Sequence, residues 1–248
     1  MASKLKNAPI TEALIDLRVE APVGTSMSLI DKLRGEVRDR YPARKRMMLF
    51  EGQMSIGDQV GASARQRELG DVFTSEDGKQ IFQARMDGFT FSRLRPYGTW
   101  EELRDEAQRL WKIYKACVNP LKITRVAVRY VNRIDVPLAK INYEDYFQTN
   151  PAVSPTLPQG LSSFFMQLQF PQPDFAGLAI LNLMATPPHV PGTTSVILDI
   201  DVFKEEPMGF VSESDAWELL EQLRKRKNEF FFQSLTQKAL DLYPEEET

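Results

Sequence analysis

The stretch ITRVAVRYVNRIDVP, residues 123–137, lies near the middle of the 248-residue chain and predicts a long β-strand. Apolar side chains occupy most alternate positions, and arginines stand at 125, 129 and 133. Because successive side chains of a strand point to opposite faces, Arg125, Arg129 and Arg133 should share one face. Asn132 falls on the apolar face, where a buried carboxamide needs hydrogen-bond partners, so we expect it to be a structural anchor.

The segments before this strand alternate between strand and helix patterns. Asp87-Gly88 is the dipeptide of a two-residue type I′ hairpin, and Thr99 with Glu102 forms a capping box that begins a helix. The expected elements are a strand at 12–21, a helix at 25–42, strands at 46–57 and 70–74, a hairpin at 81–94 and a helix at 99–119.

A similar order follows the central strand. The expected elements are a short helix at 142–147, strands at 162–170, 175–185 and 193–203, and a long helix from Ser212 to about Leu242. The sequence thus predicts an α+β fold of two tandem halves, residues 1–120 and 121–248, packed as one compact unit. Each half reads strand, helix, antiparallel sheet, helix, which is similar to the two-layer architecture of TATA-box-binding protein or of helix-grip proteins.

Charge and composition limit the classes of function. The chain has 31 basic and 34 acidic residues, a net charge of -3, so nucleic acid could be attracted only by a local patch. The single cysteine, Cys117, excludes an intramolecular disulfide and falls on the buried stripe of its expected helix. The single cysteine also fits a reducing compartment, so we expect a cytoplasmic protein, and without an apolar run long enough to cross a bilayer we expect no membrane partner.

The expected strand SVILDIDVF, residues 195–203, places Asp199 and Asp201 on one face. If this strand neighbours residues 123–137, the aspartates lie across from the arginines. Two interpretations stay open, a cross-strand ladder of ion pairs on a solvated surface, and an arginine-lined surface that receives an acidic partner or a phosphate. Two aspartates alone are a weak basis for a Mg²⁺ site.

Two further clusters are candidate contact surfaces. A basic patch lies at the end of the first expected helix and is either a solvated face or a nucleic-acid contact: Arg38, Arg40, Arg44, Lys45 and Arg46. Phe230, Phe231 and Phe232 are consecutive in the last helix, so at least one should point away from the sheet beneath it, toward a partner or toward the other half.

The sequence carries no recognisable catalytic signature. His189, the single histidine, lies in the loop sequence PPHVPG without a Cys-x-x-Cys motif, so we expect no zinc site and no Ser-His-Asp triad. The common glycine-rich nucleotide motifs are absent. We therefore predict no catalytic residues, no metal and no cofactor.

APITEALIDL, VRYVNRID, LDIDVF and FFFQSLT are blocks whose order resembles a sporadically distributed family of bacterial proteins of about 250 residues with no assigned activity. The resemblance implies an accessory gene, including those near bacterial defence or toxin-antitoxin genes. We expect a non-enzymatic protein-interaction or scaffold module that engages a protein partner or itself. The alternatives are a nucleic-acid or nucleotide binder that uses the arginine face, and a helix-grip binder of a small apolar ligand.

Overall fold

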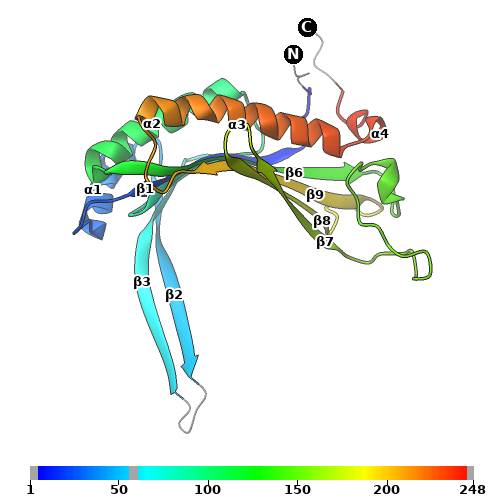
Figure 1. Cartoon of the computed structure of the whole chain (residues 1–248), viewed down its shortest axis with the longest axis horizontal. Coiled ribbons are helices and arrows are strands. Elements are labelled where there is room, and N and C mark those ends of the chain that lie inside the picture. Colours follow the sequence, from blue (N-terminus) through cyan, green and yellow to red (C-terminus); the bar gives the residue numbers. More distant parts are fainter. Residues whose placement is uncertain (1–4, 56–60, 245–248) are drawn as a thin grey trace.

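The structure of the chain is a computed structural model, which describes residues 5–55 and 61–244. It is a mixed α+β fold with a nine-stranded antiparallel sheet in the order β2-β3-β4-β5-β1-β6-β9-β8-β7 (Figure 1). The strands are β1 (Ile10–Glu20), β2 (Ala43–Ser55), β3 (Gly61–Thr74), β4 (Gln80–Arg85), β5 (Gly88–Leu94), β6 (Lys122–Val136), β7 (Phe165–Gln172), β8 (Gly177–Thr186) and β9 (Thr194–Glu205). The helices are α1 (Met27–Val37), α2 (Trp100–Val118), the 3₁₀ turn η1 (Tyr143–Asp145), α3 (Glu213–Ser234) and α4 (Gln237–Leu240).

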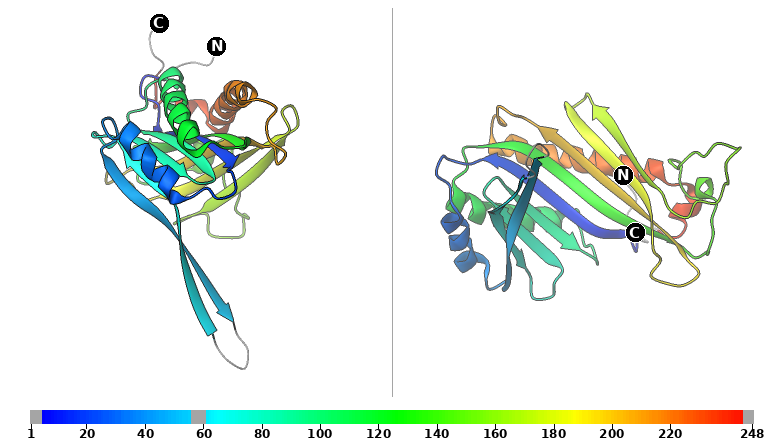
Figure 2. Two further views of the ribbon diagram at one scale, coloured as in Figure 1. Left: turned by 90° about the vertical axis from the view of Figure 1, so that its left-hand side faces the viewer. Right: turned by 90° about the horizontal axis from the view of Figure 1, so that it is seen from below.

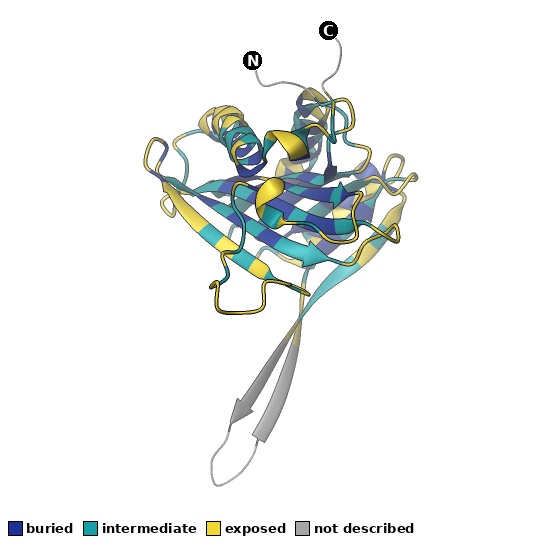
Figure 3. Cartoon of the chain, turned by 90° about the vertical axis from the view of Figure 1, so that its right-hand side faces the viewer, coloured by how far each residue is buried: buried dark blue, intermediate teal, exposed yellow. Residues whose placement is uncertain are grey.

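The helices α1, α2 and α3 lie on one face of the sheet (Figures 1 and 2). The sheet curves away from them, so the opposite face, called the open face below, lies on the inside of the curve (Figure 1). Buried residues gather where the helices meet the sheet (Figure 3). The hairpin of β2 and β3 extends well beyond the other strands (Figure 1).

The centre of the sheet is the antiparallel pair β1 and β6, in which Ile15 pairs with Val128 and Leu17 with Val126. These four side chains are buried beneath the helices. On β6 the alternation predicted for residues 123–137 is confirmed, because Arg125, Arg129 and Arg133 project from the open face. The strand begins and ends one residue earlier than predicted.

Apolar stripes hold the helices on the sheet. The predicted capping box of Thr99 and Glu102 is present, and α2 buries a stripe that includes Trp111 and Tyr114. Phe89 of β5 lies edge-on to both rings, at centroid distances of 5.8 and 6.1 Å. Each such aromatic pair stabilises a core by about 0.5–1.5 kcal/mol beyond area burial.

The hairpin at 81–94 is present, but its turn differs from the prediction. Gly88 pairs with Arg85, so Met86-Asp87 forms the two-residue loop in place of Asp87-Gly88. A Cβ on Gly88 would lie 2.7 Å from the carbonyl oxygen of Leu17, which explains the glycine by close approach of β1.

The long final helix is shorter than predicted. Ser212 caps α3 together with Asp215, as expected, but α3 ends at Ser234, and Leu235 is extended. Leu235 forms a β-bridge with Phe147, after which Thr236 caps the short α4. Tertiary pairing therefore interrupts a helix that its own sequence does not stop.

Other differences are smaller. The expected helix at 142–147 is reduced to the 3₁₀ turn η1, and Cys117 is partly exposed, since Val118 takes the buried position beside it. The expected strand at 70–74 belongs to the much longer β3, and residues 56 and 57 of the expected strand at 46–57 lie outside the described residues. None of the helices in the described ranges is both long and apolar enough to cross a bilayer.

Candidate functional site

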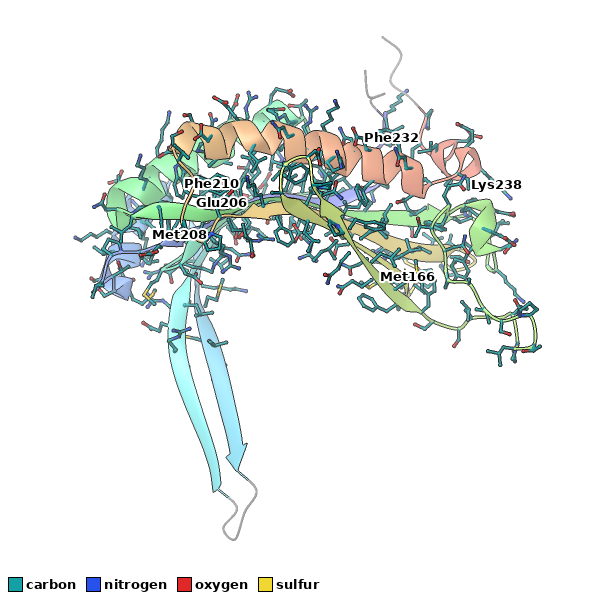
Figure 4. All side chains as sticks on the ribbon, viewed as in Figure 1. Met166, Glu206, Met208, Phe210, Phe232 and Lys238 are labelled. Atoms are coloured by element: carbon teal, nitrogen blue, oxygen red, sulfur yellow. The ribbon has the colours of Figure 1, made fainter. Side chains whose placement is uncertain are left out.

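The arginine row of β6 lies at the middle of the open face, from which side chains project below the sheet in Figure 4. On one side β6 pairs with β1, and on the other it pairs with β9, which carries Asp199 and Asp201. The predicted neighbourhood of arginines and aspartates is therefore present. Each arginine has a different set of partners.

Arg129 lies directly opposite Asp201 but binds Asp199. Its Nε and Nη2 donate to the two carboxylate oxygens of Asp199 at 2.8 and 2.7 Å, the bidentate arrangement that favours arginine over lysine. Asn182 of β8 donates a third hydrogen bond to Asp199 at 3.1 Å. The Asp199 side chain is 4% exposed and that of Arg129 is 45% exposed, so the open face presents the outer side of this guanidinium.

Arg125 bridges β1 and β9. Its Nη1 donates to Asp16 at 2.9 Å, and its Nη2 donates to Asp201 at 3.2 Å. Asp16 also accepts hydrogen bonds from Arg85 at 2.9 Å and from Thr90 at 2.6 Å. Burial alone would raise the pKa of Asp16, but the charge of Arg85, the Thr90 hydrogen bond and the charges of Arg18 and Arg125 outweigh it and lower that pKa.

Asp201 is less well satisfied than Asp16. Burial raises the pKa of Asp201 by more than the charges of Arg125 and Arg129 lower it. Its Oδ1 is buried and accepts no hydrogen bond from the described residues. This carboxylate oxygen therefore lies beneath the surface of the open face without a hydrogen bond from the described residues.

Arg133 has a structural environment. Its side chain is 8% exposed, and its Nη2 donates to the carbonyl oxygen of Pro187 at 2.8 Å and to Oγ of Ser195 at 2.9 Å. Its Nε donates to Asp135 at 3.0 Å. This arginine fastens the loop after β8 to the sheet and has little surface for a ligand.

Charges on the open face are balanced. Each arginine on β1, β4 and β6 lies within salt-bridge distance of a carboxylate, and β9 supplies aspartates to this network. The open side of these strands carries both signs of charge: Arg18, Arg85, Arg125, Arg129 and Arg133 lie among carboxylates that include Glu12, Asp16, Asp135, Asp199, Asp201 and Glu205. This geometry fits the ion-pair ladder better than a surface with surplus positive charge.

Apolar side chains adjoin the ladder on β7, β8 and β9. Phe165, Met184 and Ile197 follow one another across the three strands at the level of Arg133, and Ile180 lies opposite Asp201. Phe165 is 63% exposed, and the others are half-buried. We call the following five residues the apolar patch: Phe165, Leu178, Ile180, Met184 and Ile197.

The basic patch at 38–46 is divided by the fold. Arg44 and Arg46, on β2, both bind Asp71, which is fully buried, and Asp31 of α1. Arg40 pairs with Glu106 at 3.0 Å, and Arg38 with Asp39 at 3.7 Å. Lys45 is exposed. Four of the five cations are thus engaged by carboxylates.

The three consecutive phenylalanines of α3 all contact the core. Phe231 is 7% exposed, while Phe230 and Phe232 are partly buried and pack against the core. The Phe230 ring contacts Phe170 of β7 at a centroid distance of 5.1 Å. Figure 4 labels Phe232 on the C-terminal half of α3 and Met166 on β7. We expected at least one of these rings to point away from the sheet. Phe230 and Phe232 do so only in part, since both are half-buried.

Asn132 is 1% exposed and donates from Nδ2 to the carbonyl oxygens of Leu198, at 3.0 Å, and of Tyr130, at 3.4 Å. It has the geometry of the expected anchor. His189 lies in the loop between β8 and β9. Among the side chains that the structure describes, those of residues 5–50 and 66–244, no three His, Cys, Asp or Glu groups are placed so as to hold a metal ion.

Sequence reasoning missed Asp16 and Arg85, which complete the ion-pair network, and Asp71, which binds two arginines of the basic patch. Asp16 was visible as a polar-face residue of a strand, but its partner Arg125 is 109 residues away. No protein-family model matches this chain, and no curated protein matches it at a significant level.

Proposed function

We propose that this protein is a non-enzymatic interaction module that binds a protein partner on the open face of its sheet. The observation that carries the proposal is the apolar patch beside a ladder of ion pairs that is already neutralised. A partner that covers the patch removes apolar area from water, which is the dominant favourable contribution in most protein–protein association. The concave shape of the sheet suits a convex or extended partner segment (Figure 1).

The charge balance favours a protein over a nucleic acid. Phosphate binding needs cations that are free to replace counterions. Each arginine on the open side of β1, β4 and β6 instead has a carboxylate neighbour.

The architecture is proposed to be a pseudo-repeat of two halves, residues 1–120 and 121–248. The order β1-α1-β2-β3-β4-β5-α2 is followed by β6-η1-β7-β8-β9-α3, and β1 and β6 are antiparallel neighbours at the centre of the sheet. The second half has one strand fewer, and η1 stands in the place of α1. A saddle of this kind, similar to that of TATA-box-binding protein, here supports protein contact.

The resemblance to sporadically distributed bacterial proteins directs the search for the partner. Such accessory genes, including those of defence and toxin-antitoxin systems, act together with neighbouring genes. Products of the adjacent genes in the native genome, in the cytoplasm, are therefore the first partners to test.

Matched variants test the proposed surface. Met184→Glu places a charge in the apolar patch, whereas Met208→Glu makes the same change at a residue that is 87% exposed in the loop after β9 (labelled in Figure 4). Light scattering and pull-down with the purified products of adjacent genes should show that Met184→Glu weakens binding and Met208→Glu does not. Equal binding by both variants would contradict the proposal, as would a monodisperse monomer that captures no protein from its native host. Salt-sensitive binding of an oligonucleotide instead would favour the nucleic-acid alternative.

A further inference from the structure

A cavity of about 650 Å³ lies on the helix side of the sheet, the side opposite to the ladder and the apolar patch. Side chains of α2 and α3 contact each other from Lys115 with Glu213 to Trp100 with Glu221, after which α3 continues beyond the start of α2. The cavity lies at that end, between the last turns of α3, the first turn of α2, β6, the loop 95–99 and the segment 5–10. Figure 2 shows α2 and α3 side by side above the sheet.

Lys227 is the unusual residue of this cavity. It falls on the buried stripe of α3 with Leu220, Leu223 and Phe231, and it is 7% exposed. Among the described residues no carboxylate lies within salt-bridge distance of its ammonium group, and no hydrogen-bond acceptor is in reach. Its Nζ lies over the Tyr130 ring, 3.6 Å from the centroid. A cation–π contact offsets part of the cost of burying a charge, but a buried ammonium without an anion is costly.

The other charges of the cavity have mostly the same sign. Lys6, Arg95 and Arg224 line it together with Lys227, and Glu101 is the carboxylate among the described lining residues. Arg224 stacks on Trp100, 5.5 Å from the ring centroid, and lies 3.7 Å from Glu221. The cavity also takes in Thr99 and Trp100, at the N-terminal end of the 19-residue helix α2, where the capping box of Thr99 and Glu102 already satisfies backbone groups.

The remaining wall is apolar and aromatic. Tyr97 and Tyr130 join their hydroxyl groups at 2.8 Å, and their rings meet edge-on. Trp100, Phe231 and Phe232 supply further ring surface. A cavity of this size accommodates a small molecule, and a few placed polar groups among apolar walls are typical of ligand sites.

We propose that this cavity binds a small molecule with an anionic head, a carboxylate or a phosphate, and an apolar body. The head lies between Lys227 and Arg224 near the start of α2, and the body lies against the aromatic wall. Binding of this kind supplies the anion that Lys227 lacks. The site is separate from the proposed partner surface, and neither proposal depends on the other.

Titration of Lys227 should make ligand affinity at this site depend on pH. Burial, aided by repulsion from Arg224, lowers the pKa of Lys227 to about 7. The other ionisable groups that face it are Lys6, Arg95, Arg224, Glu101, Tyr97 and Tyr130, and burial raises the pKa of both tyrosines. An anion that binds the ammonium form must therefore draw a proton onto Lys227 above pH 7, and its affinity should fall by up to about tenfold per pH unit.

Calorimetry with four probes tests the proposal. Octanoate and octyl phosphate carry the proposed head groups, while octylamine and octanol carry the same chain without an anion. We expect the two anions to bind, octanoate to take up a proton above pH 7 in buffers of different ionisation enthalpy, and octylamine and octanol not to bind. Lys227→Met keeps an unbranched apolar side chain and should weaken octanoate binding by about 30-fold or more. The matched control is Lys225→Met, at an exposed position of the same helix, which should bind octanoate as the parent does.

Three results would overturn the proposal. One is binding of all four probes with similar affinity, which would make the cavity a general apolar site. Another is unchanged octanoate affinity in Lys227→Met, and the third is failure of both anions to bind at millimolar concentration. Circular dichroism of each variant establishes that a loss of binding does not reflect unfolding, and Arg224→Gln provides a second variant of the head-group site.

Discussion

The guanidinium of Arg129 binds both carboxylate oxygens of Asp199, although Asp201 is the residue directly across from it on β9. Because Arg129 pairs diagonally with Asp199, Asp201 accepts its hydrogen bond from Arg125, which also donates to Asp16 on β1. One arginine therefore joins β9 to β1 across β6, and the next one satisfies a carboxylate that is almost fully buried. These two contacts tie together the strands at the middle of the sheet.

The Arg129–Asp199 pair should contribute measurably to stability. Removing Arg129 leaves the nearly buried Asp199 carboxylate with Asn182 as its remaining side-chain donor. Because Arg129 is 45% exposed, we expect a loss of about 1–3 kcal/mol in the free energy of unfolding, below the cost of breaking a fully buried pair. A double-mutant cycle of Arg129→Gln and Asp199→Asn in urea measures the coupling. The surface pair Lys238–Asp145 is the control and should show a smaller coupling, because solvent screens both charges. Equal coupling in both pairs would refute the role of burial.

Asp16 and Asp201 should respond to pH in opposite ways. The pKa of Asp16 is lower in the folded state than its ordinary value of 3.8, so its carboxylate contributes stability above that pH and loses it as the pH falls through the folded pKa. The pKa of Asp201 is raised, so its ionised form costs stability at neutral pH, and protonation relieves the cost.

The opposite pKa shifts predict different stabilities for the variants Asp16→Asn and Asp201→Asn as the pH is lowered. Asp16→Asn should destabilise the protein at pH 7 and converge on the parent at low pH. Asp201→Asn should cost less at pH 7 than Asp16→Asn does. Urea midpoints collected between pH 2 and 7 measure both, and a larger loss for Asp201→Asn would contradict the assigned directions.

Local sequence patterns predicted many elements of this fold, whereas other features depend on contacts between residues that are far apart in the chain. Alternation along residues 123–137 predicted the two faces of β6, and the Thr99 and Ser212 caps predicted where α2 and α3 begin. The end of α3 was not predictable, because Leu235 leaves the helix to pair with Phe147, 88 positions earlier in the chain. Local sequence contains no helix stop there, so a tertiary contact decides.

The candidate sites also combine features that the local sequence predicts with features that depend on the strand order. The shared face of Arg125, Arg129 and Arg133 follows from strand periodicity, whereas the partner Asp16 requires knowledge of the strand order. The position of Lys227 was available in principle, since it follows Leu220 and Leu223 and precedes Phe231 at helical spacing. Lysine is a common residue on the solvated face of helices, so its place on the apolar stripe does not by itself indicate burial.

The two proposed halves should not fold independently. β1 lies between β5 and β6, and its ladder with β6 extends from Ile10 to Glu20. A fragment of residues 1–120 lacks β6 and leaves β1 as a long unpaired edge, which promotes association. We expect the fragment to be unfolded or oligomeric by sedimentation and the full chain to unfold in one calorimetric transition. A monomeric fragment with its own cooperative transition would show that the halves are separate domains.

Lys227→Met should stabilise the unliganded protein at neutral pH. The pKa of Lys227 is lowered from 10.5 to about 7, so the folded state disfavours the ammonium form. The resulting penalty is complete below pH 7 and fades as the pH rises toward 10.5, since the unfolded chain then also loses the proton. We expect a gain of about 1–4 kcal/mol for Lys227→Met at pH 6 that shrinks steadily toward pH 10.

The matched change Lys225→Met, at an exposed position of the same helix, should alter the free energy of unfolding by less than about 0.5 kcal/mol at every pH. Urea unfolding across this pH range measures both variants. A loss of stability in Lys227→Met at pH 6 would mean that the contact of the ammonium with the Tyr130 ring outweighs its desolvation. Buried lysine would then be a structural element, and the cavity would have no unmet charge to attract an anion.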